Sequence, residues 1–272
     1  MPERPARVGV DSYAYHRLLG ETRPGETPTP HLFPRGSLDV VTEARRLALD
    51  FVLLQTSFLG DPAAVSPAVV VDEADDLAVG LSWSAPQGLA FGEHAEALRH
   101  LAEWLEQAAR LGLPVMRIVA GGPEQRGQPA GRLVGPLQEA CAAAHDHGLR
   151  LALENHGDLT ALELEWLVDQ VDGDLRVCFD TANALRVEDD VAAAARRLAP
   201  WIEILHLKDC VAAWDDPVTG PLSVPLGAGV IPVDAVLDAC PDALVCIELG
   251  QLSPDADERS LVGSYVEYVR AR

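Results

Sequence analysis

The sequence has few of the features that mark membrane, secreted or disulfide-bonded proteins. No apolar run approaches the roughly 18 residues that suggest a membrane span, and the N-terminal MPERPARVGV has no apolar stretch typical of a secretion signal. The five cysteines are odd in number and scattered, with no CxxC pair. These absences argue against a membrane partner and against a disulfide framework. They favour a protein of the reducing cytoplasm.

Positive charge is also scarce. The 272 residues include 21 Lys and Arg against 42 Asp and Glu, which gives a formal net charge of −21. A nucleic-acid-binding protein needs a cationic surface, whereas this chain should repel phosphate backbones over most of its surface. We therefore expect no nucleic-acid partner.

Apolar residues, by contrast, make up 48% of the chain, enough for a large buried core. Eight short runs rich in Val, Ile and Leu are apolar nearly throughout, which is typical of parallel strands covered on both faces. The predicted strands are Arg7–Tyr13, Phe51–Ser57, Val79–Ala85, Pro114–Ala120, Leu149–Asn155, Leu175–Thr181, Ile202–Lys208 and Ala243–Leu249.

Helical patterns lie between these runs. The clearest are Glu93–Leu111, Leu133–His147, Thr160–Val171 and the last, Asp257–Ala271. One stretch is ambiguous, because the Val69–Val71 run within Asp61–Leu77 suits a strand as well as a helix. No linker-like change of composition divides the chain. Eight strand–helix alternations predict an α/β protein, a single (β/α)8 TIM barrel over residues 1–272.

Four of the predicted strands end in a side chain that binds metals. They are Glu154 in LRLALENH, Asp180 in LRVCFDTAN, His206 in IEILHLKD and Glu248 in ALVCIELG. The first three are spaced by 26 residues, about one strand, one helix and two loops, so they recur at the same point of successive units. The C-terminal ends of barrel strands converge on one face, which should bring these four side chains together.

A single carboxylate at a strand end is more often a helix cap or a salt-bridge partner, but four suitable groups at matching ends favour a metal site. Three carboxylates and one imidazole form a mostly hard-oxygen site. The predicted cofactor is therefore a divalent metal, Mn²⁺ or Mg²⁺, with Co²⁺ or Zn²⁺ as alternatives.

The barrel order together with ALENH, CFDTAN, LHLKD, PLGAGV and CIELG resembles the xylose isomerase-like superfamily, also called the AP endonuclease family 2 or sugar phosphate isomerase/epimerase group. The resemblance covers essentially the whole chain. It implies that Glu154, Asp180, His206 and Glu248 are the metal ligands, and that Glu154 and Glu248 are the catalytic acid/base pair. It also implies a small carbohydrate or sugar-acid substrate and, because members often form dimers or tetramers, a homo-oligomer.

Other polar residues near these strand ends are candidate substrate ligands. His156, two residues after Glu154, should point the same way while the strand lasts. Asn183 stands where some epimerases of the group carry a substrate-binding His, a departure that weakens transfer of their sugar specificity. Lys208 could bind a substrate oxygen or anchor Asp209. Arg117 could contact substrate or pair with a ligand carboxylate.

The N-terminal segment DSYAYHRLLGE supplies further candidates. It places His16, Arg17 and Glu21 after the first predicted strand, next to a long loop, Leu18–Ser37, with four prolines. Long ordered loops in compact domains tend to be functional. The loop is either a surface lid with solvated charges or a substrate element in which Arg17 or His16 binds a carboxylate. The segment also resembles that of 3-oxo-isoapionate decarboxylases.

The leading hypothesis is a metal-dependent isomerase or epimerase that acts on a small ketose or keto-polyol through an enediolate, with two glutamates as acid and base. The alternative is a lyase, a metal-dependent decarboxylase of a 3-oxo sugar acid such as 3-oxo-isoapionate. A buried Arg at the far end of the substrate would favour the lyase, and neutral hydroxyl-binding groups the isomerase. A DNA repair endonuclease is disfavoured by the acidic charge, and a catalytically silent binding protein by the intact ligand set.

Overall fold

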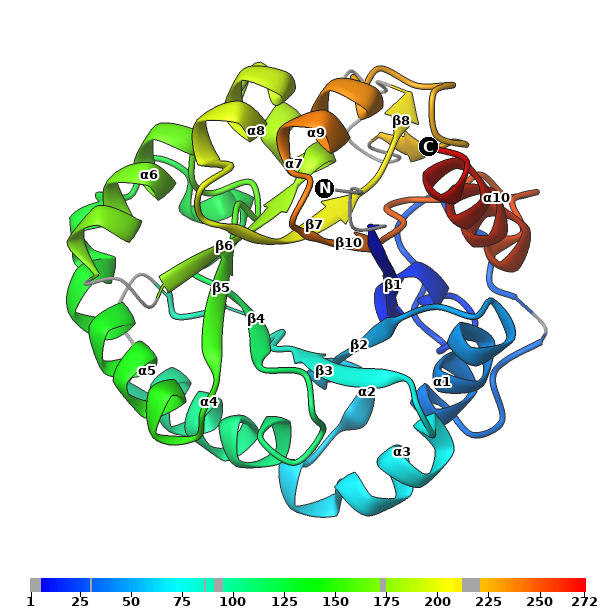
Figure 1. Ribbon diagram of the computed structural model, residues 1–272, viewed down its shortest axis with the longest axis horizontal. Helices are drawn as coiled ribbons and strands as arrows, with labels where there is room; N and C mark the ends of the chain where they lie inside the picture. The colour runs from blue at the N-terminus through cyan, green and yellow to red at the C-terminus, as the bar shows by residue number, and fades with distance from the viewer. Residues whose placement is uncertain (1–5, 30, 86, 91–94, 172–174, 212–220) are drawn as a thin grey trace, which may run out of the picture.

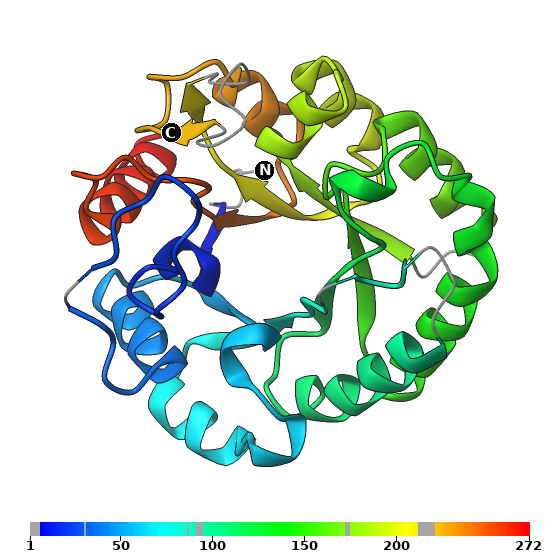
Figure 2. The ribbon, with the colours of Figure 1, turned by 180° about the vertical axis from the view of Figure 1, so that it is seen from behind.

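The chain folds into a closed barrel of eight parallel strands surrounded by helices (Figures 1 and 2). The computed structural model describes residues 6–29, 31–85, 87–90, 95–171, 175–211 and 221–272. Neighbouring strands follow the chain order around the barrel, and the last strand closes on the first. The barrel strands are β1 (Arg7–Asp11), β2 (Phe51–Gln55), β3 (Ala78–Ser82), β4 (Val115–Val119), β5 (Arg150–Glu154), β6 (Leu175–Asp180), β7 (Ile202–Leu207) and β10 (Leu244–Ile247).

The predicted single (β/α)8 TIM barrel is therefore confirmed. All eight predicted strands are present, each one to three residues shorter than predicted, and β3 begins one residue earlier. The helices between the strands are α1 (Ser37–Arg46), α2 (Thr56–Leu59), α3 (Pro67–Ala74), α4 (Ala95–Ala108), α5 (Val134–Asp146), α6 (Ala161–Gln170), α7 (Thr181–Arg186), α8 (Val191–Leu198), α9 (Val233–Ala239) and α10 (Glu258–Arg270). The longer helices cover the outer face of the barrel in Figure 1, whereas the short helices α2 and α7 directly follow strands and contribute residues to the cavity described below.

The ambiguous second unit is helical. Pro67 stands at the start of α3, where its missing N–H is not needed and its fixed φ suits a helix. Val70 packs inward, while Val69 and Val71 are exposed. The predicted helix over Thr160–Val171 is confirmed as α6, with the capping box formed between Thr160 and Glu163. The predicted start of α4 at Glu93 lies outside the described residues.

Two apolar cores hold the barrel. The larger one fills the space between the strands and the helices. The smaller one lies among the strands themselves and contains, from four neighbouring strands, Ala152, Cys178, Ile204 and Cys246. Each of these four residues precedes a predicted metal ligand by two positions. Because side chains two apart in a strand point to the same face, Glu154, Asp180, His206 and Glu248 are directed inward above this core.

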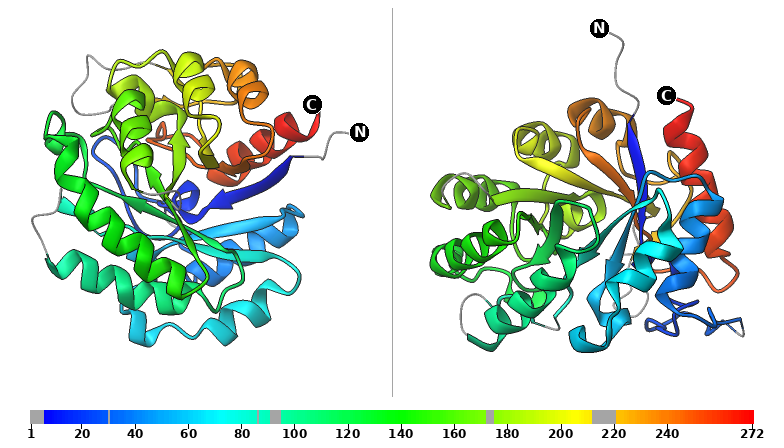
Figure 3. Two further views of the ribbon diagram at one scale, coloured as in Figure 1. Left: turned by 60° about the vertical axis from the view of Figure 1, so that its left-hand side comes forward. Right: turned by 60° about the horizontal axis from the view of Figure 1, so that its bottom comes forward.

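The first and last elements of the barrel pack beside each other. Helix α10 lies against the short 3-10 turn η1 (Ser12–Tyr15) that follows β1, and Figure 3 shows β1 and α10 on the same side of the barrel. A short antiparallel pair, β8 (Cys210–Val211) with β9 (Leu222–Ser223), follows β7. Among the described residues, no helix is both long and apolar enough to cross a membrane.

The PLGAGV motif forms a tight loop against the end of β7. Three backbone N–H groups of this region, from Gly227, Gly229 and Ile231, donate to the carboxylate of Asp209 at 2.9–3.1 Å. A Cβ atom at Gly229 would lie 2.2 Å from Oδ1 of Asp209, so only glycine fits there. The loop thus fixes the chain just after His206 and Lys208.

Candidate active site

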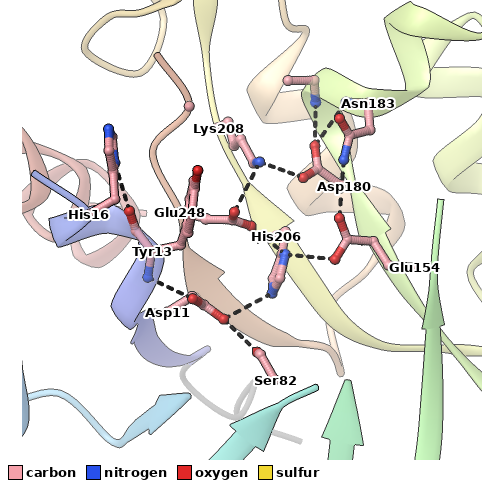
Figure 4. Close-up of polar contacts among 12 residues, drawn as sticks. Asp11, Tyr13, His16, Ser82, Glu154, Asp180, Asn183, His206, Lys208 and Glu248 are labelled. Carbon is pink, nitrogen blue, oxygen red and sulfur yellow. Dashed lines mark hydrogen bonds and ion pairs between the residues drawn. The ribbon is translucent and has the colours of Figure 1, made fainter. Parts of the chain in front are cut away.

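The four predicted metal ligands lie together at the C-terminal end of the barrel (Figure 4). Nδ1 of His206 is 2.6 Å from Oε2 of Glu248 and 3.4 Å from Oε2 of Glu154. Ligand atoms of Asp180, His206 and Glu248 all lie within 4.8 Å of one another. All four side chains are buried. A second group, Glu154, Cys178 and His206, meets the same distance limit. The alternation of the four strands therefore places three carboxylates around the imidazole of His206, in two overlapping groups.

Several nitrogen and oxygen atoms of this cluster that could bind a metal lack hydrogen-bond partners among the described residues. Neither ring nitrogen of His206 has a well-directed hydrogen bond, and the same is true of Oδ2 of Asp180 and Oε2 of Glu248. Buried polar atoms without partners carry a large free-energy penalty unless another group satisfies them. A divalent cation bound by one ring nitrogen of His206 and by these two carboxylate oxygens would satisfy three of the four atoms, so these residues form a suitable site for a metal.

Two cations contact the carboxylates of the cluster. Nζ of Lys208 lies 2.7 Å from Oδ2 of Asp180 and 3.3 Å from Oε1 of Glu248. Nε of Arg117 donates to Oε2 of Glu154. Oε1 of Glu154 accepts from the side-chain amide of Asn183 at 3.1 Å. Arg117 thus pairs with a ligand carboxylate, one of its two predicted roles.

These contacts set the charge states of the glutamates. Burial alone would raise the pKa of Glu154, but the positive charge of Arg117 outweighs it and holds the pKa well below its usual value. Burial likewise opposes the charge of Glu248, but Lys208 and His206 lower its pKa. Both carboxyl groups are therefore ionised at neutral pH, the state that a base requires.

The pKa values of the other two members of the cluster, Asp180 and His206, are raised. Burial raises the pKa of Asp180, although Lys208 partly offsets this effect. Burial alone would lower the pKa of His206, whereas the groups around its ring, first Cys178 and then Glu248, raise it well above its usual value. Burial raises the pKa of the Cys178 thiol to about 11, so it stays neutral and is a poor metal ligand beside the carboxylates.

Asp11, at the end of β1, also belongs to the cluster, and the sequence analysis did not identify it. Its Oδ2 accepts from the Ser82 hydroxyl at 2.5 Å and lies 3.9 Å from Nε2 of His206. Its Oδ1 accepts from the Gln55 amide at 3.0 Å. The signal was present, because Asp11 ends a strand as the four ligands do. The predicted strand ran on to Tyr13, and this hid the position.

A cavity of about 320 Å³ opens above the cluster. Glu154 and Glu248 both line it, as do four of the predicted substrate ligands: Arg117, His156, Asn183 and Lys208. Nδ1 of His156 contacts the Gly121 carbonyl at 2.9 Å, and burial lowers its pKa. Neutral polar groups complete much of the wall, among them Gln55, Ser84, Ser223 and Gln251.

The structure does not bring the other three predicted substrate ligands into this cavity. His16 is buried with its two ring nitrogens against Glu26 and the Tyr13 carbonyl, each at 3.0 Å. The Arg17 guanidinium donates to the carbonyls of Ser253 and Ala256. Glu21 accepts from the Tyr13 hydroxyl at 2.5 Å.

The η1 turn explains this placement. It carries the chain away from the barrel axis directly after Asp11, so that His16 and Arg17 face the packing between the N-terminal loop and the segment before α10. The role of Arg17 as a carboxylate ligand stays a prediction, although its guanidinium contacts backbone carbonyls outside the cavity. Two residues of the N-terminal segment that were not among the predicted ligands nevertheless reach the cavity: Tyr13 of η1, and Arg23 of the loop. Arg186, at the end of α7, was also missed.

Comparisons with known proteins agree with this architecture. The family described as a xylose isomerase-like TIM barrel matches residues 71–241. No curated protein matches the sequence. Among solved structures, a xylose isomerase domain protein from Planctomyces limnophilus is 18% identical, with 99% of this chain and 96% of that chain covered and a TM-score of 0.72.

Two further solved structures are similar. A D-allulose 3-epimerase from Methylomonas sp. is 16% identical, with a TM-score of 0.71 and coverage of 99% of this chain and 98% of that one. The probable 3-DHS dehydratase AsbF from Bacillus anthracis is 14% identical, with a TM-score of 0.71 and coverage of 97% and 98%. At such identities the likeness shows the shared fold.

Proposed function

Because the chain belongs to the xylose isomerase-like TIM barrel family, we propose that it is a divalent-metal-dependent isomerase or epimerase of a small ketose or keto-polyol. One observation carries the proposal: Glu154 and Glu248 approach the same atom, Nδ1 of His206, from different strands, and both line the cavity. Two ionised carboxylates beside one metal-binding point are the groups that proton transfer next to a carbonyl requires.

The proposed metal ligands are Glu154, Asp180, His206 and Glu248, with Mn²⁺ or Mg²⁺ preferred over Co²⁺ or Zn²⁺ for this oxygen-rich set. When bound, such an ion would polarise the substrate carbonyl and stabilise the negative charge of an enediolate. Asp180 is positioned for this role by the start of α7, since its Oδ1 accepts from the N–H groups of Ala182 and Asn183 at 2.9 Å.

The chain's own groups would then move the proton. One glutamate takes the α-proton, and the other returns it. Return to the opposite face of the same carbon gives epimerisation, whereas return to the neighbouring carbon gives isomerisation. Arg117 and Asn183 fix the carboxylate of Glu154 from two sides, so its position does not depend on the substrate. His156, Asn183 and Lys208 are proposed to bind substrate oxygens.

A second candidate is decarboxylation of a 3-oxo sugar acid, favoured by the number of cations in the cavity wall. The same enediolate would remain after CO₂ leaves. However, a cation that binds the departing carboxylate stabilises the ground state more than the transition state, in which that charge moves away. Isomerisation or epimerisation therefore remains the leading proposal.

The test is deuterium exchange. Protein loaded with Mn²⁺ is incubated in D₂O with a panel of ketoses and 3-oxo sugar acids, the reaction is stopped with EDTA, and proton NMR spectra are recorded. Loss of one carbon-bound proton with the carbon skeleton retained supports the leading proposal. Release of CO₂ with gain of one deuterium supports the lyase, and no exchange with any substrate of the panel contradicts both.

The remaining proposals concern the whole chain. We propose that residues 1–272 form one domain, that it acts in the cytoplasm without a nucleic-acid or membrane partner, and that it forms a homo-oligomer.

A further inference from the structure

The cavity wall is positively charged although the protein is strongly acidic. The described residues that line it include four cations, Arg23, Arg117, Arg186 and Lys208, but only two carboxylates, Glu154 and Glu248. The whole chain has a formal net charge of −21. A local excess of positive charge in such a protein indicates a specific use at this point.

Two of the four cations already have partners. Arg117 is paired with Glu154 and also donates to the Trp83 carbonyl at 3.2 Å. Lys208 is shared between Asp180 and Glu248. Arg117 and Lys208 therefore balance the charge of the proposed ligand carboxylates. Arg23 and Arg186 are not needed for that purpose.

Arg186 has no anionic partner. It is the last residue of α7, and within the described part of the chain its guanidinium forms neither a hydrogen bond nor an ion pair within 4.0 Å. The aliphatic part of the side chain passes over Gly157, where a Cβ atom would lie 3.4 Å from Cδ of Arg186. The residue is exposed overall and its side chain lines the cavity.

Arg23 is held in place by Tyr13. Its Nε donates to the Tyr13 hydroxyl at 2.9 Å, and its guanidinium carbon lies 4.8 Å from the centre of the Tyr13 ring. Its two terminal nitrogens form no ion pair with any described residue. The guanidinium is therefore oriented by an aromatic ring, while the part that forms paired hydrogen bonds to an oxyanion is available.

The two arginines also influence each other. The pKa of Arg186 is lowered mainly by the partial burial of its guanidinium and, to a smaller extent, by the positive charge of Arg23. Two like charges close enough to interact are unfavourable unless an anion lies near both. Asp180 favours the charged form of Arg186, and Glu248 favours that of Arg23. Neither carboxylate forms an ion pair with either guanidinium, so among the described residues no carboxylate directly contacts the two guanidinium groups.

We propose that Arg23 and Arg186 bind a terminal oxyanion of the substrate, a carboxylate or a phosphate group. This inference rests on the proposed function, because it concerns the same cavity, and it narrows the substrate class to sugar acids or sugar phosphates. Planar guanidinium groups form paired hydrogen bonds with both kinds of oxyanion. The group would anchor the substrate while the glutamates act on its carbonyl end.

The test measures binding and needs no turnover. Three matched four-carbon probes are titrated into the EDTA-treated protein and into the Mn²⁺-loaded protein by calorimetry: erythronate, erythritol 4-phosphate and neutral erythritol. At least one of the two anionic probes should bind about tenfold or more tightly than erythritol. An advantage for erythronate identifies a sugar acid, and one for erythritol 4-phosphate identifies a sugar phosphate.

The variants Arg23→Gln and Arg186→Gln should each remove most of this advantage and leave erythritol binding unchanged. Arg197→Gln is the matched control. Arg197 pairs with Glu165 on the outer helices, so this substitution removes the same charge at a position away from the cavity. Arg186→Lys keeps the charge but loses the paired hydrogen bonds, so its affinity should be intermediate. This variant also serves if Arg186→Gln does not fold.

The inference is overturned if both anionic probes bind no more tightly than erythritol, or if the anionic advantage survives in both Gln variants. These outcomes are distinct from failure of the proposed function. Deuterium exchange of neutral ketoses without any preference for anionic probes would reject the arginine pair alone. Tight binding of an anionic probe to a protein that exchanges no proton would reject the proposed reaction alone.

Discussion

The ammonium group of Lys208 lies 2.7 Å from Oδ2 of Asp180, at the point where a metal ligand should face its ion. Lys208 is the only lysine in the sequence, which otherwise uses arginine. Burial disfavours the charged form, but the carboxylates of Asp180 and Glu248 outweigh it and raise the pKa of Lys208. A compact, point-like charge thus compensates the ligand carboxylates where a metal would do the same.

Replacing Lys208 should therefore change metal affinity. In Lys208→Gln the carboxylates of Asp180 and Glu248 lose a compensating charge, so Mn²⁺ should bind about tenfold more tightly, which corresponds to about 1.4 kcal/mol. Electron paramagnetic resonance of free Mn²⁺ measures this. Arg126→Gln, an exposed position paired with Glu163, is the control. Equal or weaker Mn²⁺ binding by Lys208→Gln would show that the ammonium does not compete with the ion.

Because there is one lysine, the same contact is visible by spectroscopy. Selective ¹⁵N labelling of lysine gives one side-chain signal, and addition of Mg²⁺ should shift it as Lys208 gives up its place between Asp180 and Glu248. A signal that stays unchanged at saturating Mg²⁺ would place the ion elsewhere.

Metal binding should stabilise the fold through His206. A ligand that binds only the folded state adds about 2.7 kcal/mol at a hundred times its Kd, so Mn²⁺ should raise the melting temperature of the wild type. In His206→Ala this increase should be largely lost, since one of the buried ligands is gone. Differential scanning calorimetry with and without EDTA measures the shift. An undiminished shift in His206→Ala would mean that the ligand set is misassigned.

The barrel and the clustering of the four candidate metal ligands could be predicted from the sequence because both follow from local rules. Apolar runs of strand length can be recognised without tertiary contacts. The same is true of the candidate ligands, because each follows by two positions an inward-facing residue of the strand: Ala152, Cys178, Ile204 or Cys246. The spacing of Glu154, Asp180 and His206 was enough to place three of the four ligands on successive strands.

The loops were not predictable in the same way. Whether His16, Arg17 or Arg23 enters the cavity depends on the η1 turn and on contacts with residues more than 220 positions away, such as Ala256 and Gln251. Arg186 follows Asp180 by six residues, and only the short helix α7 brings it back over Gly157. Nothing in the local sequence distinguishes these arginines from surface arginines.

The buried pair of Arg117 and Glu154 should be intolerant of single replacements. Arg117→Met leaves the Glu154 carboxylate buried without its main counter-charge, which should lower the free energy of unfolding by about 3–5 kcal/mol. The double variant Arg117→Met/Glu154→Gln should recover a large part of this loss, because no uncompensated charge remains. Urea denaturation of the wild type, both single variants and the double variant measures the coupling. If the losses of the single variants simply add, the pair is not coupled.

Asp158 predicts a pH dependence of stability. Its carboxyl is buried, and neither oxygen has a well-directed hydrogen bond from a described residue. Burial raises its pKa to about 7, against an ordinary value of 3.8, although nearby backbone N–H groups oppose this effect. Between these values the folded state binds more protons than the unfolded state, so this group's contribution to stability falls as the pH rises. Above pH 7 the loss is complete and amounts to at most about 4 kcal/mol.

Asp158→Asn cannot ionise, so its stability relative to the wild type should increase between pH 5 and pH 8.5. Urea denaturation at both pH values measures this difference. Asp72→Asn, at an exposed position on α3, removes the same charge and should show no such trend. A constant difference between Asp158→Asn and the wild type would mean that Asp158 is ionised throughout this range.

We propose that Glu154 and Glu248 transfer a substrate proton beside a bound metal. Deuterium exchange into a ketose or sugar-acid substrate is compared for Mn²⁺-loaded wild type, Glu154→Gln and Glu248→Gln, with Mn²⁺ occupancy measured for each. We expect the wild type to exchange one carbon-bound proton and each variant to lose exchange by at least about 100-fold while it stays folded. Full exchange by either variant with metal bound would contradict the two-glutamate account.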